Sequence, residues 1–208
     1  MKSNWNIFLS QKRNRNILFG SVIALAATLF CFLHFLTYNE SRIGFVFHDP
    51  VLGLFEPFNI SLLTFIVTYS FAVAGIAIAL RTPVLFIRLM QGYTIMTLIR
   101  VVCLYFVPLE PPADIIPLYD LLLKVSFYSG RDNLKDLFFS GHTASIFLFA
   151  FVFKERKLKI IFLTGSVAVA LLVVLQHVHY SIDVIAAPLV SWLSLKIQEK
   201  LMGKTERG

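Results

Sequence analysis

Apolar runs of about membrane-spanning length alternate with polar connections along this chain. Six such runs occur: 17–36, 60–80, 84–107, 138–153, 160–176 and 181–195. At the rise of an α-helix, the first three are each long enough to cross about 30 Å of hydrocarbon. The last three are shorter or carry polar residues at one end, as interior-facing helices with functional termini would. The pattern predicts an all-α fold, a polytopic membrane helix bundle with six transmembrane helices.

Composition supports a membrane protein. Of the 208 residues, 57% are hydrophobic and 15% are charged, which is too apolar for an ordinary soluble domain. The first run follows a basic segment, as in a signal peptide, but it is too long for one and lacks a small-residue cleavage pattern. We therefore expect it to be retained. Because no repeat or linker divides the chain, residues 1–208 are expected to form a single membrane domain.

The distribution of charge predicts an orientation. The net charge of +7 does not require nucleic acid, because the basic residues lie in alternate connections, as the positive-inside rule describes. The side that holds both termini carries most of the lysines and arginines, whereas the other side carries only Arg42, Lys124, Arg131 and Lys135. We therefore expect both termini in the cytoplasm, and membrane lipids rather than nucleic acid as partners.

A polar turn opens the fourth apolar run. Ser140, Gly141 and His142 lie where a loop becomes a helix, and the exposed backbone N–H groups at the N-terminus of a helix favour a phosphate. The alternative is structural, with Ser140 only capping the helix and His142 an ordinary interfacial residue. Taken alone, the segment predicts a phosphate subsite without deciding between these two interpretations.

A second polar cluster separates the last two apolar runs. His179 and Asp183 are four residues apart and share a face if the stretch is helical, so the carboxylate can fix the imidazole tautomer for attack or proton transfer. His177 is expected to face elsewhere. A hydrogen bond that only ties two helices together, or a proton relay in a transporter or channel, stays open. No metal-binding motif accompanies these residues, and we expect neither a metal nor a cofactor.

The two clusters together resemble a known family. Phe-Ser-Gly-His-Thr at 139–143, followed after one span by His-Tyr-Ser-Ile-Asp-Val at 179–184, is similar to the sphingomyelin synthase family, within the type-2 phosphatidic acid phosphatase superfamily. Four further residues fall at the spacing of that family's Arg, Tyr, Leu and Pro: Arg100, Tyr105, Leu109 and Pro112. The resemblance implies six spans and a catalytic pocket on the non-cytoplasmic face.

The resemblance also implies a role for each polar residue. His179 would be the nucleophile that forms a phosphohistidine, and Asp183 would orient it. His142 would protonate the departing lipid alcohol and then act as the base for the acceptor. Val173 departs from the pattern, because it stands where lipid phosphatases of the superfamily have an arginine. A phosphate clamp from that position is therefore absent.

Positive charge must still balance the phosphate. The far-side candidates are Arg100, Arg131 and Lys135, with arginine preferred because its guanidinium binds two oxygens at once. Arg100 falls inside an apolar run, where a charge costs at least about 2.5 kcal/mol unless paired or hydrated, so the alternative is snorkelling to the interface. The other two have the alternative of being exposed loop charges. Tyr180, with acidic residues of the loop, is a candidate aromatic face for a cationic headgroup, and the alternative is an acidic loop that is only solvated.

These features favour a headgroup transferase over a phosphatase. A lipid phosphomonoester is a dianion that calls for several arginines, whereas a phosphodiester carries one negative charge. We therefore expect a phosphotransferase that moves a phosphocholine- or phosphoethanolamine-type headgroup from a glycerophospholipid to a ceramide or diacylglycerol-type acceptor. A lipid phosphate phosphatase of the same superfamily is the alternative, and a non-enzymatic transporter or channel is a more distant one.

Overall fold

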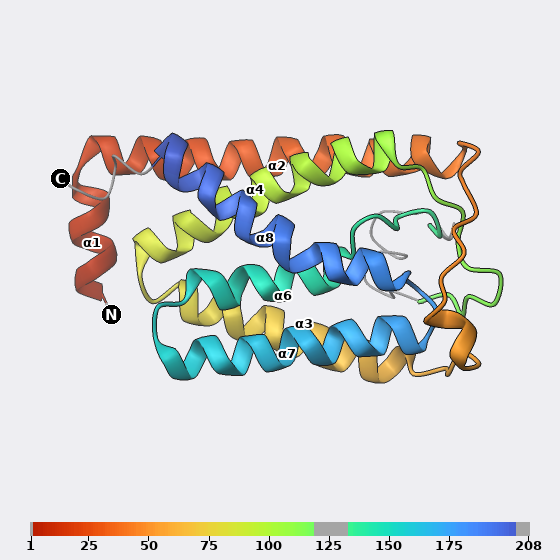
Figure 1. The fold of residues 1–208 in the computed structure, drawn as a ribbon. Helices are drawn as coiled ribbons and strands as arrows, with labels where there is room; N and C mark the ends of the chain where they lie inside the picture. The colour runs from red at the N-terminus through yellow and green to blue at the C-terminus, as the bar shows by residue number, and fades with distance from the viewer. Residues whose placement is uncertain (1, 119–132, 203–208) are drawn as a thin grey trace.

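The computed structural model describes residues 2–118 and 133–202, and its elements in these ranges are helical (Figure 1). They are α1 (Lys2–Ser10), α2 (Lys12–Glu40), η1 (Leu52–Leu54), α3 (Ser61–Ala79), α4 (Pro83–Phe106), α6 (Gly141–Val152), α7 (Arg156–Leu175) and α8 (Ser181–Met202). Within these ranges no strand occurs, and an isolated bridge joins Phe45 to Leu109. The predicted all-α fold is confirmed.

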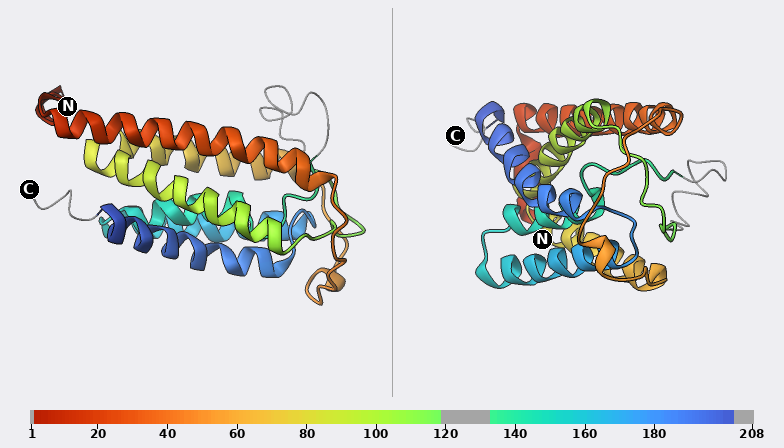
Figure 2. Two further views of the ribbon diagram at one scale, coloured as in Figure 1. Left: turned by 90° about the horizontal axis from the view of Figure 1, so that it is seen from above. Right: turned by 45° about the vertical axis from the view of Figure 1, so that its right-hand side comes forward.

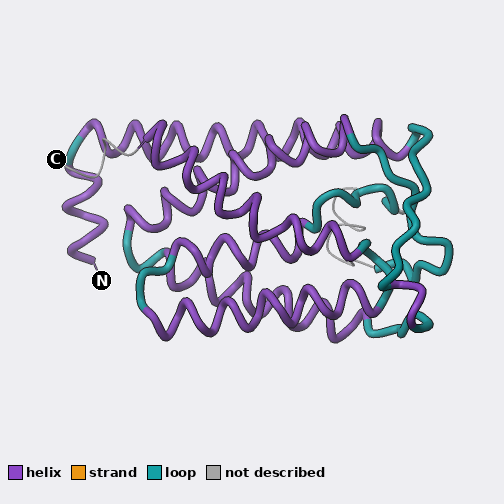
Figure 3. Tube along the Cα trace, in the orientation of Figure 1, coloured by secondary structure: helices purple, strands orange, loops and turns teal. Residues whose placement is uncertain are grey.

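The long helices lie along a common axis and reverse direction from one to the next (Figures 1 and 2). α1 and the end of α8 lie at one end of the bundle, which we call the terminal end. The long connections gather at the opposite end, the loop end (Figure 3). α6 packs against α7 and α8 and also contacts α3 and α4, whereas α2 packs mainly on α4. α6 is therefore the central helix of the bundle.

The sequence predicts six spans, and four helices of the described ranges are long and apolar enough to cross a membrane. By length and composition, α2, α3, α4 and α7 can cross a membrane. The predicted run 138–153 becomes α6, whose 12 residues cover only about 18 Å, well short of the hydrocarbon thickness. The predicted run 181–195 becomes α8, which has Asp183 in its first turn and Lys200 in its last. Six transmembrane helices are therefore not confirmed, because α6 is short and α8 is polar at both ends.

Close packing fixes α6 in the centre. Ala144, Ile146 and Leu148 are completely buried, and the ring of Phe149 lies where a side chain on Gly75 of α3 would be, since an added Cβ would meet it at 2.5 Å. Small residues allow such close approach of helices in a membrane, where dispersion contacts replace the hydrophobic effect as the driving force. The start of α6 is thereby held inside the bundle.

The stretch 133–140, which leads into α6, is not helical, and side chains of α2 satisfy part of its backbone. Oε2 of Glu40 accepts from the N–H groups of Leu134 and Lys135 at 3.1 and 3.0 Å. Nδ2 of Asn39 donates to the carbonyl of Lys135 at 2.8 Å. Non-helical backbone is tolerated at membrane depth only where protein or water surrounds it. α2 therefore supports the approach to α6.

The connection between α2 and α3 lies over the loop end, and we call its residues 43–58 the strap. The N–H of Phe45 donates to the carbonyl of Pro108 at 2.8 Å, and the N–H of Glu110 donates back to Phe45 at 2.9 Å. At the far end of the strap, the N–H of Phe58 donates to the carbonyl of Leu175 at 2.9 Å. The strap thus joins the end of α4 to the end of α7.

Candidate active site

The polar turn 140–143 forms the N-terminus of α6. Ser140 is the N-cap, with an extended backbone, and its Oγ accepts a hydrogen bond from the N–H of Thr143 at 3.4 Å. The Ser140 hydroxyl also lies 3.0 Å from the hydroxyl of Thr143. The capping role that the sequence offered as a structural alternative is therefore present. It fixes the first turn of α6, whose N–H groups point toward the loop end.

Arg100 lies directly against this first turn. It is 7% exposed, and its Nε and Nη2 donate to Oδ1 of Asp136 at 3.0 and 2.8 Å. The rings of Phe32 and Phe139 flank it, with centroids 5.8 and 5.6 Å from Cζ. A Cβ at Gly141 would collide with Nη1 of Arg100, so only glycine lets the guanidinium reach this helix terminus. Arg100 is buried and paired, which differs from the snorkelling alternative.

His179 and Asp183 form a buried pair at the start of α8. Nδ1 of His179 lies 3.2 Å from Oδ2 of Asp183, and the two side chains are 3% and 0% exposed. The same carboxylate oxygen accepts from the N–H of Tyr180 at 3.1 Å. When Nδ1 carries the proton, Asp183 holds the ring in the tautomer that leaves Nε2 free to attack or to take up a proton. The four-residue spacing seen in the sequence thus produces the predicted contact.

One backbone hydrogen bond joins the two polar clusters. The N–H of Ser140, at the cap of α6, donates to the carbonyl of Asp183, in the first turn of α8, at 3.2 Å. His142 follows two residues after Ser140 on α6, and His179 precedes α8 by two residues. The structure therefore brings the turn of His142 and the pair of His179 together at one point inside the bundle.

A reversal of the chain after α7 positions His179. Gln176 is the C-cap of α7, and His177 follows it with φ of 55°, a left-handed conformation that is common directly after a helix but usually taken by glycine. The N–H groups of Val178 and His179 turn back to the carbonyl of Val173 at 3.0 and 3.4 Å. His177 packs against Phe55 of the strap, with ring centroids 5.2 Å apart, and does not line the pocket described next.

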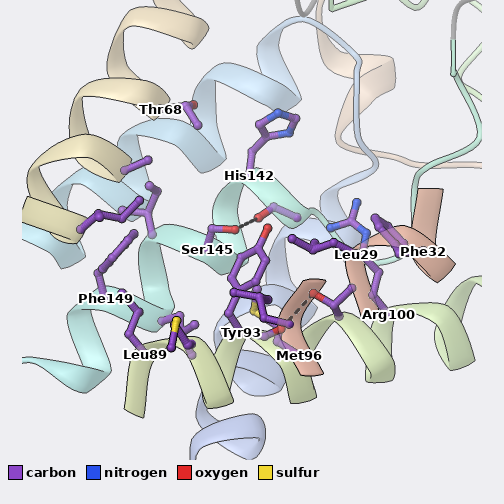
Figure 4. A pocket seen from close by; sticks show the side chains of 18 of the residues that line it. Leu29, Phe32, Thr68, Leu89, Tyr93, Met96, Arg100, His142, Ser145 and Phe149 are labelled. Carbon is purple, nitrogen blue, oxygen red and sulfur yellow. Dashed lines mark hydrogen bonds between the residues drawn. The ribbon is translucent and has the colours of Figure 1, made fainter. Parts of the chain in front are cut away.

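An apolar pocket of about 590 Å³ lies beneath the start of α6 (Figure 4). Its walls come from α2, α3, α4 and α6, and its volume is in the range of ordinary ligand sites. Arg100, Gly141 and His142 line it, together with Asp136. Arg100 is the only lysine or arginine among the described lining residues. His179 does not line the pocket and is 2% exposed.

Two further predicted residues, Lys135 and Tyr180, do not line this pocket. Nζ of Lys135 donates to Oε1 of Glu110 at 2.9 Å and to the carbonyl of Arg42 at 2.7 Å, and its hydrogen bond holds the pKa of Glu110 below the ordinary value. The hydroxyl of Tyr180 donates to the carbonyl of Glu110 at 2.9 Å, and burial raises the pKa of Tyr180. Arg131 lies outside the described residues.

Asp49 of the strap binds the first residue of α8. Its Oδ2 accepts from the N–H of Ser181, and its Oδ1 accepts from the Ser181 hydroxyl at 3.0 Å and from the N–H of Val51 at 2.9 Å. Burial by itself would raise the pKa of Asp49, but these hydrogen bonds outweigh it and lower the pKa below the ordinary 3.8. Asp49 therefore stabilises the turn that carries His179.

Replacing Asp49 by asparagine is expected to lower the free energy of unfolding by about 1–2 kcal/mol at pH 7, because a charged acceptor of three hydrogen bonds is lost. The folded-state pKa is depressed, so the contribution of the carboxylate is present above the unfolded value and is lost as the pH falls through the folded one. Thermal unfolding in detergent of wild type and Asp49→Asn should therefore converge below pH 3.8. The exposed Asp114→Asn serves as a control, and a gap that stays constant down to pH 3 would contradict this account.

Two residues of this region carry contacts that the sequence does not predict. Asp136 is one acid among several in its connection, and nothing in its local pattern indicates a partner 36 residues away on α4. Asp49 is separated from Ser181 by 132 residues, and no spacing rule links them. Within the described ranges, no three His, Cys, Asp or Glu side chains gather closely enough to hold a metal ion.

Comparison with known proteins gives one match, which covers the C-terminal part of the described chain. Residues 135–200 match the family model of the PAP2 superfamily C-terminal region, a segment that contains both polar clusters but not Arg100. The match supports the type-2 phosphatidic acid phosphatase superfamily, whose members are generally phosphatases or phosphotransferases. It does not distinguish the sphingomyelin synthase family within that superfamily. Neither the curated proteins nor the solved structures that were compared gave a match.

Proposed function

We propose that this protein is an integral membrane lipid phosphotransferase. It moves a phosphocholine- or phosphoethanolamine-type headgroup from a glycerophospholipid to a ceramide or diacylglycerol-type acceptor through a phosphohistidine on His179. The observation that carries the proposal is the junction of the Asp183–His179 pair with the α6 turn of His142, above an apolar pocket. The superfamily match supports the same class of chemistry.

In the first step, Nε2 of His179 attacks the phosphorus of the donor diester. The N–P bond forms as the bond from phosphorus to the diacylglycerol oxygen breaks, and His142 donates a proton to that oxygen. Asp183, which faces Nδ1 at 3.2 Å, stabilises the positive charge that the imidazole acquires. Diacylglycerol leaves into the bilayer, and the headgroup phosphate stays on His179.

In the second step, the acceptor hydroxyl gives its proton to His142, and its oxygen attacks the phosphorus. The N–P bond breaks, the new phosphodiester forms, and both histidines return to their starting state. The phosphoryl oxygens lie best at the N-terminus of α6, because backbone N–H groups and the helix dipole favour an anion there. Arg100, held against Gly141, supplies the positive charge beside that point.

The charge around the pocket favours a diester over a monoester. Arg100 is the one cation among the described lining residues, and Asp136 already neutralises it in part. Position 173, where lipid phosphatases of the superfamily have an arginine, holds a fully buried valine. A dianion would find too little positive charge here, whereas a singly charged diester can share the guanidinium with Asp136.

The reaction is proposed to take place on the non-cytoplasmic face of the membrane, with both termini in the cytoplasm. Support comes from the distribution of basic residues, because Lys12, Lys154 and Lys196 belong to the terminal end of the bundle while the polar clusters open toward the loop end. The acceptor hydroxyl and the donor headgroup then reach His142 from that leaflet.

The deciding experiment is a transfer assay with the purified full chain in phospholipid vesicles. Phosphatidylethanolamine or phosphatidylcholine with a labelled headgroup is supplied together with ceramide. We expect the label to appear on ceramide, with one diacylglycerol formed for each headgroup transferred. His34→Ala, on the outer helix α2 and bonded only to its own helix at Phe30, serves as the matched histidine control and should retain activity.

The other outcomes identify the alternatives. Release of the label only as free phosphocholine or phosphoethanolamine would mean that water takes the place of the lipid acceptor, and it would overturn the transfer step. Phosphatidic acid is supplied in a parallel reaction, where release of inorganic phosphate without any headgroup transfer would make the protein a lipid phosphate phosphatase. Absence of any product with all of these lipids, from protein that still unfolds cooperatively, would leave a transporter or channel as the better interpretation of the His179–Asp183 pair.

A further inference from the structure

Among the hydroxyl-bearing side chains that line the apolar pocket, that of Thr68 is buried without a hydrogen-bond partner among the described residues. Thr68 of α3 lines the pocket together with His142 and is only 6% exposed. Its Oγ1 is buried and has no hydrogen-bond partner among the described residues. A buried hydroxyl without a partner in an apolar environment is destabilising, so its presence in this wall requires an explanation.

Thr68 differs from two other threonines of the bundle in the hydrogen bonding of its hydroxyl. A threonine inside a helix usually donates to the carbonyl four residues before it. Thr64, one turn earlier on the same helix, donates to Ile60 at 3.1 Å, and Thr97 on α4 donates to Tyr93 at 2.9 Å. The Thr68 hydroxyl forms no such bond. It is therefore available to a molecule inside the pocket.

The shape of the pocket indicates what that molecule is. α2 packs mainly on α4, and α3 packs on α7 and α6, so α2 and α3 make little contact although both line the pocket. Ile76 of α3 lines the pocket and is 44% exposed, so the pocket reaches the outer surface of the bundle at this residue. The lining of α2 extends from Leu25 to Leu36, about 17 Å along the helix axis. An elongated apolar chain fits this space.

We propose that the pocket takes one acyl chain of the lipid substrate, and that the Thr68 hydroxyl donates a hydrogen bond to the carbonyl oxygen at the head of that chain. The carbonyl belongs to an ester in a glycerolipid and to an amide in ceramide. It lies only a few bonds from the oxygen that reacts, which agrees with Figure 4, where Thr68 and His142 lie on the same side of the pocket and Leu89 and Phe149 lie farther away. This inference rests on the proposed function for the identity of the lipid.

Equilibrium binding to the full-length His179→Ala protein in detergent tests the contact without turnover. Three lipids are compared: diacyl phosphatidylethanolamine, its dialkyl ether analogue, and ceramide. Thr68→Val keeps the shape of the side chain and removes the hydroxyl. It should lower the affinity for the carbonyl-bearing lipid that occupies the pocket by about two- to tenfold. The affinity for the ether analogue should stay unchanged. Thr64→Val, whose hydroxyl is bonded within α3, should bind all three lipids as before.

The outcomes separate this inference from the proposed function. Three outcomes would overturn the carbonyl contact. Thr68→Val could lower the affinity for the ester and the ether lipid equally, or it could lower the affinity for none of the lipids. The third outcome is that no lipid binds to protein that remains folded. Carbonyl-dependent binding through Thr68, in a wild-type protein that turns over none of these lipids, would support the contact and refute the transferase. Thermal unfolding of each variant confirms that the fold is retained.

Discussion

Replacing His179 by alanine is expected to abolish headgroup transfer, with a fall in rate of about 10⁴-fold or more, as for the removal of a catalytic nucleophile in other enzymes. The imidazole is the only buried nucleophile held by a carboxylate in the described part of the chain, and without it no N–P bond can form. The protein is incubated briefly with donor lipid labelled in the headgroup phosphate and then denatured at alkaline pH, where a phosphohistidine is stable. The label retained on the protein is measured. A phosphoserine differs because it survives treatment with acid, which removes the label from a histidine.

Two controls make this result specific. His34→Ala should retain the labelled intermediate, because that side chain lies on α2 and bonds only to Phe30. Asp183→Asn should accumulate the intermediate more slowly, since an amide does not hold the His179 tautomer or stabilise its positive charge as the carboxylate does. A labelled phosphohistidine in the His179→Ala protein would refute the role given to His179.

Replacing His142 by alanine is expected to slow transfer from a natural phospholipid by about 10²- to 10⁴-fold, the usual contribution of a general acid. The effect should depend on the leaving group. A diacylglycerol alkoxide needs a proton as it departs, whereas p-nitrophenolate does not. With a p-nitrophenyl ester of the same phospho-headgroup, formation of the phosphohistidine should therefore be close to that of wild type in His142→Ala.

The choice of donor is the control built into this experiment. His142→Ala protein that is equally slow with both donors would show that His142 positions the phosphate or maintains the helix terminus instead of transferring a proton. Ser145 follows His142 on α6, and its hydroxyl donates to the carbonyl of Gly141 at 2.7 Å. The turn therefore has its own support, and the substitution at position 142 should leave it in place.

Much of the scaffold could be predicted from local sequence. The apolar run 60–80 becomes α3 at Ser61–Ala79, and the run 84–107 becomes α4 at Pro83–Phe106, because an apolar stretch in lipid must satisfy its backbone within one helix. The His179–Asp183 contact and the cap at Ser140 also follow from spacing, since each is formed within four residues. Predictions of this kind succeed because both partners belong to one turn of chain.

Contacts between distant segments could not be predicted in this way. Lys135 was one of three candidate cations for the phosphate, and its ion pair with Glu110, 25 residues earlier, has no signal in the local sequence. Arg100 was a candidate of uncertain position, and its place against Gly141 depends on the packing of α4 on α6. The shortness of α6 was also missed, because Phe138 and Phe139 extend the apolar run although the helix begins only after Ser140. A hydrophobic stretch indicates burial but does not by itself indicate a helix. Phe139 is buried and Phe138 partly buried, although both lie in a non-helical segment.

The hydrogen-bond partners of the stretch 133–140 determine at which point of synthesis the proposed site can be assembled. Asn39 and Glu40 are made early, and Arg100 follows them. The carbonyl of Asp183, which accepts from the N–H of Ser140, belongs to α8 and is made after α7. His179 itself emerges just before α8. A nascent chain halted after α7 therefore lacks both the proposed nucleophile and the hydrogen bond between α6 and α8. Under the proposed function, lipids of the host bilayer would meet an assembled centre only after α8 has been added.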